Sequence, residues 1–226
     1  GHLRSVTSIA FSSDNRTLAS SSLDGSVQLW DAGTGVEKLT IKGPGKVRVV
    51  AANLDGHILA SGNSEGLVTL WDPETGSEIV TIHNNSQSVE DVACSPDGLT
   101  LACASRDLPI RLWDITSGER LRTLDTDTTG EKLLQTSNTH GTCVTFSPDG
   151  RTLAAGILEN GSILFWDLIS GHQIREIKFA HEGTAISVSF SPDGRMFASG
   201  GSDGFIGLWD TETWTKKSLR QRSRSP

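Results

Sequence analysis

Two sets of side chains in this chain combine a histidine, a serine and an aspartate, the residue types of a nucleophilic triad. Each set ends on a tryptophan, and the spacing within the two sets is identical. The members are His2, Ser20, Asp24 and Trp30 in one set, and His181, Ser199, Asp203 and Trp209 in the other. Because the set recurs in register and includes an indole, we interpret it as structural. The sequence predicts no catalytic residue.

The two tryptophans belong to a longer series that organises the whole chain. Five Trp-Asp pairs follow one another at intervals of 41, 42, 53 and 43 residues. They are Trp30-Asp31, Trp71-Asp72, Trp113-Asp114, Trp166-Asp167 and Trp209-Asp210. A fixed period of this size is typical of an array of one supersecondary unit. Such arrays mostly present a surface, which favours binding over chemistry.

Each unit reads as four short strands. In the first, alternating or apolar runs cover 6–11, 17–20, 26–30 and 36–41. Turn residues separate the runs, because Pro presets φ, Asp caps its own backbone and Gly accepts positive φ. The turn after the first run recurs as 12–15, 53–56, 95–98, 147–150 and 191–194. The sequence therefore predicts an all-β fold of four-stranded antiparallel meanders.

With these motifs the chain resembles the WD-repeat family of β-propellers, from Gly1 to about Leu219. The resemblance implies one domain over 1–219, followed by a basic, disordered tail over 220–226. The five blades are expected at about 1–42, 43–84, 85–124, 137–179 and 180–219. An insertion loop is expected over 125–139.

Five repeats leave the closure of the propeller open, because this family usually closes with more blades. One prediction is an open arc of a larger propeller, with the chain a piece of a longer polypeptide. A five-bladed ring, or closure by dimerisation, is the alternative. An open arc would leave a blade face uncovered at each end.

The resemblance also assigns roles to the two histidine sets. In each, the aspartate accepts from the histidine, the histidine bonds the serine, and the serine accepts the indole N–H. A buried network of this kind is strong only when it is complete. The middle repeats depart from it: Gly43 and Asn85 stand at the histidine position, Cys103 at the serine position and Asn160 at the aspartate position, and Ser137 lies near the histidine position. We expect those blades to be weaker.

By register with the family, residues at the ends of the inner strands form the predicted partner-binding face. They are Lys46, Arg48, Ser88, Glu90, Arg106, His140, Thr142 and Glu159. Their charged members fall in the second to fourth repeats and suggest a partner segment of acidic character. The insertion loop would belong to the same face, because insertions in repeat arrays cluster on one face.

Composition narrows the partners further. The net charge is −7, and the 20 basic residues include five in the last eleven positions, which leaves 15 basic against 27 acidic residues elsewhere. An acidic body argues against nucleic acid as the main partner, except weakly through the tail. No apolar run is long enough to span a membrane. Three scattered cysteines, Cys94, Cys103 and Cys143, show no metal spacing and favour a reducing compartment.

These observations predict a non-catalytic, cytoplasmic scaffold that binds other proteins or peptides through the loop faces of a propeller. No cofactor, metal or small-molecule substrate is expected. The alternative is a sensory or regulatory propeller of a larger multidomain enzyme, or a propeller hydrolase.

Overall fold

The computed structural model describes residues 1–226 apart from 13, 53–56, 85, 106–108, 125–140, 159 and 222–226, with the backbone alone over 218–221. The described residues contain twenty strands and no helix. None of them therefore forms a helix long and apolar enough to cross a membrane. The strands form five separate antiparallel sheets of four strands each.

Each sheet is a blade made of four consecutive strands. Blade 1 consists of β1 (Val6–Phe11), β2 (Thr17–Ser22), β3 (Ser26–Asp31) and β4 (Glu37–Lys42). Blade 2 consists of β5 (Val47–Ala52), β6 (Leu59–Asn63), β7 (Leu67–Trp71) and β8 (Glu78–His83). Blade 3 consists of β9 (Val89–Cys94), β10 (Thr100–Ser105), β11 (Ile110–Asp114) and β12 (Arg120–Leu124). Blade 4 consists of β13 (Gly141–Phe146), β14 (Thr152–Ile157), β15 (Ile163–Asp167) and β16 (Gln173–Ile177). Blade 5 consists of β17 (Ala185–Phe190), β18 (Met196–Gly201), β19 (Phe205–Asp210) and β20 (Lys216–Gln221).

The Trp-Asp pair ends the third strand of every blade and shapes the turn that follows. In each blade the pairing of the third and fourth strands shifts register at the tryptophan. The aspartate carboxylate then accepts a hydrogen bond from the backbone N–H three residues later. In blade 1 the Thr34 N–H donates to Asp31 at 2.9 Å. The repeated dipeptide thus fixes a bulge and a capped turn at the same place in all five blades.

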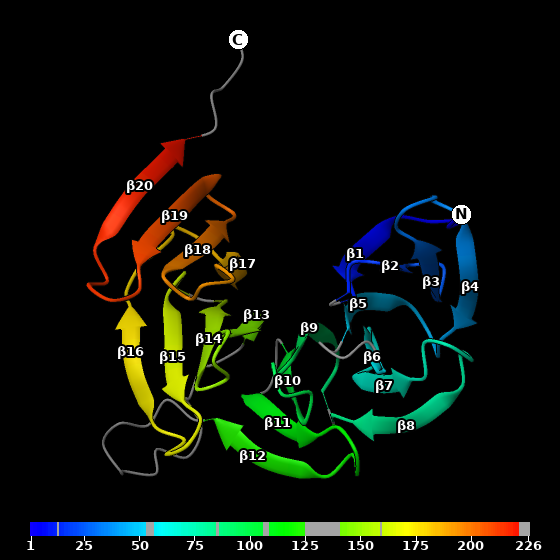
Figure 1. Ribbon diagram of the computed structural model, residues 1–226. Coiled ribbons are helices and arrows are strands. Elements are labelled where there is room, and N and C mark those ends of the chain that lie inside the picture. Colours follow the sequence, from blue (N-terminus) through cyan, green and yellow to red (C-terminus); the bar gives the residue numbers. More distant parts are fainter. Residues whose placement is uncertain are drawn as a thin grey trace.

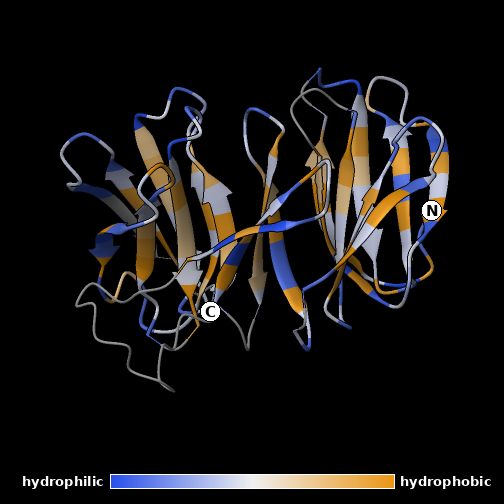
Figure 2. Cartoon of the chain, turned by 90° about the horizontal axis from the view of Figure 1, so that it is seen from below, coloured by the Kyte–Doolittle hydropathy of each residue, from blue (hydrophilic) through white to orange (hydrophobic). Residues whose placement is uncertain are grey.

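The blades stand side by side around a centre that their first strands line (Figure 1). Strand β1 contacts β5, β5 contacts β9, β9 contacts β13, and β13 contacts β17. Apolar residues fill each junction, and hydrophilic residues colour many of the loops at the two ends of the blades (Figure 2). The first and last blades lie apart (Figure 1). Of the arrangements that the sequence left open, the structure has the open arc.

At both ends of the arc, positions that are buried in the other blades are exposed. On blade 5, Ile206 is 50% exposed, although the residues at the same register position of blades 1 to 4 are all fully buried. On blade 1, Ile9 is 62% exposed, whereas Val50 at the same position of blade 2 is 4% exposed. The open arc therefore leaves an apolar blade face at each end, as expected for unpaired repeats.

Candidate functional site

The histidine network of blade 5 locks a loop to the blade that follows it in sequence. His181 is buried, its Nε2 lies 2.6 Å from Ser199 Oγ, and its Nδ1 lies 3.1 Å from Asp203 Oδ1. The Asp203 carboxylate also accepts the backbone N–H groups of Glu182 and Phe205. Together these hydrogen bonds hold the pKa of Asp203 below its usual value, although burial acts in the opposite direction.

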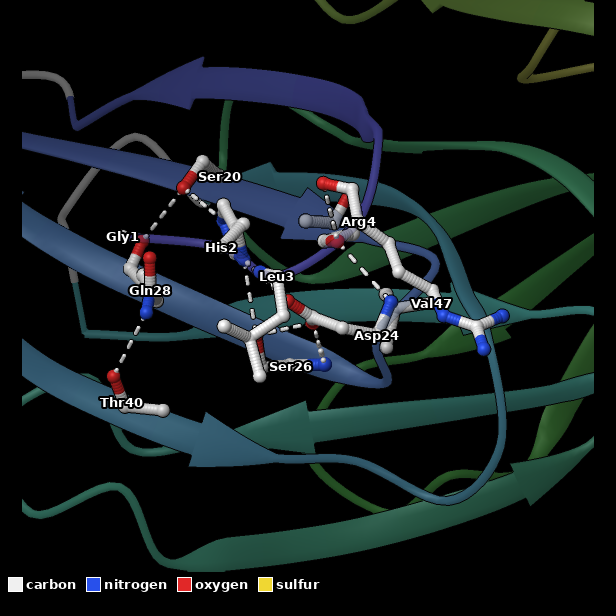
Figure 3. A network of polar contacts seen from close by, with 12 residues as sticks. Gly1, His2, Leu3, Arg4, Ser20, Asp24, Ser26, Gln28, Thr40 and Val47 are labelled. Carbon is white, nitrogen blue, oxygen red and sulfur yellow. Dashed lines mark hydrogen bonds and ion pairs between the residues drawn. The ribbon is translucent and has the colours of Figure 1, made fainter.

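Blade 1 has the same network with one difference. His2 Nε2 lies 2.7 Å from Ser20 Oγ (Figure 3), and the Trp30 indole N–H donates to that hydroxyl at 2.8 Å. The other ring nitrogen lies closer to Ser26 Oγ, at 3.0 Å, than to Asp24 Oδ2, at 3.5 Å. Ser26 in turn donates to Asp24 at 2.6 Å. A serine hydroxyl therefore strengthens the histidine-aspartate link in this blade.

Trp209 does not complete the network of blade 5, contrary to the implication of the sequence. Among the described contacts its indole N–H makes no hydrogen bond to Ser199. The ring lies instead across Gly207, where a Cβ atom would come within 1.9 Å of it, and it packs against Phe197. The equivalent residue of blade 1 by strand register is Gln28. The glycine lets the ring lie flat on the strand.

The middle blades replace the missing histidine in different ways. In blade 2, Asn63 bonds Pro44 O and accepts the N–H groups of Glu65 and Leu67. Asn63 thus caps the turn between β6 and β7. The Trp71 indole still donates to Ser61 at 2.8 Å.

In blade 3 the asparagine that precedes the histidine position is buried. Asn84 is fully buried and donates to Ser105 Oγ at 2.7 Å, while Asn85 and Asp107 lie outside the described residues. The Trp113 indole N–H is buried without a hydrogen-bond partner, because Cys103 stands where Ser20 and Ser61 accept in blades 1 and 2.

In blade 4, Asn160 caps its turn by accepting the backbone N–H of Ser162, and Ser137 is not described.

A central cavity of about 290 Å³ is the place where all five blades meet. Each innermost strand contributes to its wall, including Thr7 of β1, Arg48 of β5, Glu90 of β9, Thr142 of β13 and Ile186 of β17. These side chains come from positions up to 179 residues apart in sequence. The cavity combines charged, hydroxyl and aliphatic groups.

The charged groups of the cavity are partly paired. Arg48 Nη2 lies 2.7 Å from Glu90 Oε2, with 37% of the Arg48 side chain and 10% of the Glu90 side chain exposed. Beside them, Asp91 accepts the backbone N–H of Val144 from the next blade at 2.9 Å. Burial raises the pKa of Asp91 to about 7 despite its hydrogen bonds. Asp91 therefore ties β9 to β13 and changes charge near neutral pH.

The structure brings together only some of the residues predicted to bind a partner. Arg48, Glu90 and Thr142 line the cavity, and Lys46 is exposed at the entry to β5. Ser88 is half-buried, and its hydroxyl has no hydrogen-bond partner. Arg106, His140, Glu159 and the whole insertion loop lie outside the described residues. Sequence reasoning missed Asp91, whose only signal was its place on an inner strand.

The described residues assemble no catalytic constellation. Two pentapeptides match the Gly-x-Ser-x-Gly pattern of hydrolases, at 62–66 and 200–204, but both are hairpin turns between two strands rather than strand-to-helix turns. Burial raises the pKa of the Cys143 thiol to about 12, far from that of a nucleophile. No group of three His, Cys, Asp or Glu side chains among the described residues has the geometry of a metal site.

Comparison with known protein families matches this architecture to one model, described as WD domain, G-beta repeat. The model matches five times, at residues 1–31, 35–72, 76–114, 131–167 and 171–210. The chain belongs to the WD40 family. A search of curated proteins found no match.

The WD40 repeat and the blade are offset by one strand. The second, third and fifth matches begin just before the outermost strand of one blade and end at the Trp-Asp pair of the next, as 35–72 includes β4 and β5 to β7. Each of these three repeats therefore bridges two blades, and the loop that joins them carries the histidine position. This explains why the histidine network connects blades rather than stabilising one sheet alone.

Proposed function

We propose that this WD40 protein is a non-catalytic scaffold that binds protein segments on the face where the inner strands begin. WD40 repeats generally mediate protein interactions, and the central cavity is the observation that supports the site. All five blades contribute to it, so a segment bound there would contact the whole array. A propeller fold alone supports many functions, so the proposal rests on this cavity.

The partner segment is proposed to carry a carboxylate. Arg48 has five N–H donors and engages Glu90 through one terminal nitrogen, so donors remain for a second carboxylate. More than a third of the Arg48 side chain is exposed, and Lys46 is exposed nearby in sequence. A flexible acidic segment would gain charge-assisted hydrogen bonds at both residues.

The cytoplasm is the proposed compartment. Cys103 and Cys143 are buried thiols that form no disulfide. Buried thiols of this kind suit a reducing compartment. Nucleic acid is not proposed as the main partner, because the body of the chain is acidic.

A selection from a phage-displayed library of random twelve-residue peptides tests this function. The wild-type chain should enrich peptides that contain Asp or Glu. The variant Lys46→Glu with Arg48→Gln should bind a synthetic copy of the leading peptide at least about tenfold more weakly, the equivalent of 1.4 kcal/mol. Gln keeps amide donors for Glu90 while removing the charge.

Arg195→Glu is the matched control, because Arg195 is an exposed cation at the turn after β17, at the opposite end of a blade. It should leave binding unchanged. The proposal fails if no peptide is enriched, or if both variants bind the peptide as the wild type does.

A further inference from the structure

Phe179 is an exposed aromatic residue on the same face as the cavity mouth. It lies in the connection from β16 to β17 and is 76% exposed. Its backbone N–H donates to Ser162 Oγ in the hairpin between β14 and β15. Among the described residues only Phe11 is another exposed aromatic, and Phe11 lies on the open end face of blade 1. Phe179 faces solvent although both neighbouring blades are present.

Its connection is longer than those of the first two junctions. Ile41, Ile82 and Ile177 share one register position on the outermost strands, and Val47, Val89 and Ala185 share one on the innermost strands. The connection from Ile177 to Ala185 is one residue longer than that of the β8–β9 junction and two longer than that of the β4–β5 junction. The added length places Phe179 outside the junction instead of in its core.

The backbone that carries Phe179 is both fixed and strained. Ala180 and His181 after it are buried, His181 N donates to Gly161 O, and the imidazole is held by the network of blade 5. Phe179 itself has φ of 49°, in the left-handed region that is unfavourable for a bulky residue. Such strain persists where surrounding structure enforces it, and it clusters at functional sites. A rigid, exposed aromatic is also the residue type that dominates binding energy at protein interfaces.

We propose that Phe179 is the apolar anchor for the segment bound at the central cavity, and that this segment carries an aliphatic or aromatic side chain near its acidic residue. The inference rests on the proposed function. The β16–β17 connection runs from the outer strand of one blade to the inner strand of the next, where Ile186 is 57% exposed and lines the cavity. A segment following it meets Phe179, then Ile186, then Arg48.

Strand spacing sets the expected distance between the two partner residues. Three intervals of about 4.8 Å separate an outermost from an innermost strand, or roughly 14 Å. An extended segment advances about 3.3 Å per residue, so about four residues reach the innermost strand. More than about four should separate its apolar residue from its acidic one, because Arg48 lies further on, on β5 of blade 2.

The test uses the same peptide library with Phe179→Asn and Phe179→Leu. Asn tolerates the left-handed backbone but has no apolar surface, whereas Leu keeps apolar surface. Peptides enriched by the wild type should carry the spaced apolar and acidic residues. The Asn variant should lose the apolar preference, keep the acidic one and bind the leading peptide about tenfold more weakly. The Leu variant should retain most binding, and the melting temperature of the Asn variant should be unchanged or raised.

Each contrary result has a separate meaning. Acidic peptides without an apolar preference would overturn the role of Phe179 and leave the scaffold function standing. The same holds if the Asn variant selects the same apolar residue, or if it melts several degrees lower with binding unchanged, since Phe179 would then be structural. No enrichment by the wild type would overturn both proposals.

Discussion

The buried indole of Trp113 offers a direct test of how the repeat is stabilised. In blades 1 and 2 the indole N–H donates to a serine hydroxyl at 2.8 Å. In blade 3 Cys103 stands at the serine position, 1% exposed, and the Trp113 N–H has no partner. Burial raises the pKa of the Cys103 thiol, so the sulfur stays protonated and is a weak acceptor. Cys103→Ser should supply the missing acceptor without changing the size of the side chain much.

The expected gain is modest but measurable. A buried N–H without a partner costs about 1–3 kcal/mol, and a serine hydroxyl at position 103 would recover this free energy. Burying a hydroxyl in place of a thiol itself costs free energy and cancels part of the gain. We expect the free energy of unfolding to rise by about 1 kcal/mol, or the melting temperature by about 2–4 °C for a domain of this size. Urea and thermal unfolding followed by tryptophan fluorescence and circular dichroism measure both.

Two controls isolate the hydrogen bond. Cys103→Ala removes the sulfur without adding an acceptor and should destabilise the chain. In a Trp113→Phe background, which has no N–H to satisfy, Cys103→Ser should bring no gain, so a double-mutant cycle should show coupling of about 1 kcal/mol. A gain of equal size in that background, or no gain with Trp113 present, would refute the reasoning.

Three other predictions concern the network, the cavity and the Trp209 position. His181→Ala should lower the free energy of unfolding by about 1–3 kcal/mol, because it leaves a buried hydroxyl without its partner; a change within error of zero in urea unfolding would contradict this. Since burial raises the pKa of Asp91 to about 7, the folded chain holds a proton that the unfolded chain releases. The free energy of unfolding should therefore fall as pH rises through 7, by about 1 kcal/mol between pH 6 and pH 8. In urea unfolding, Asp91→Asn should abolish this difference. Gly207→Ala should destabilise by about 1–3 kcal/mol by displacing Trp209, whereas Gly200→Ala, where a Cβ atom meets nothing within 4 Å, should be neutral or slightly stabilising in thermal melts.

Much of the fold could be predicted because its signals are local and repeated. The Trp-Asp period and the turn residues between short apolar runs indicate four-stranded blades without any knowledge of long-range contacts. The histidine positions of the first and fifth repeats were equally visible, since spacing within one repeat carries them. The direction of the Trp209 ring was not, because it depends on the glycine two residues earlier and on Phe197 in the adjacent strand.

The functional face depended on contacts that no local pattern records. Arg48 and Glu90 were both predicted for this face, but they are 42 residues apart in sequence, and only the approach of β5 to β9 pairs them. Phe179 gave no signal, because its exposure results from the length of one connection and from the burial of the two residues after it.

The sequence by itself determined the WD40 repeat, the composition of each blade and the residues that cap its turns, because all of these arise from interactions within about forty residues. Tertiary structure alone decided that the five blades form an open arc, which side chains share the central cavity and which aromatic stays in solvent. Those outcomes depend on how one blade packs against the next, and the apolar residues that mediate this packing look alike at every junction.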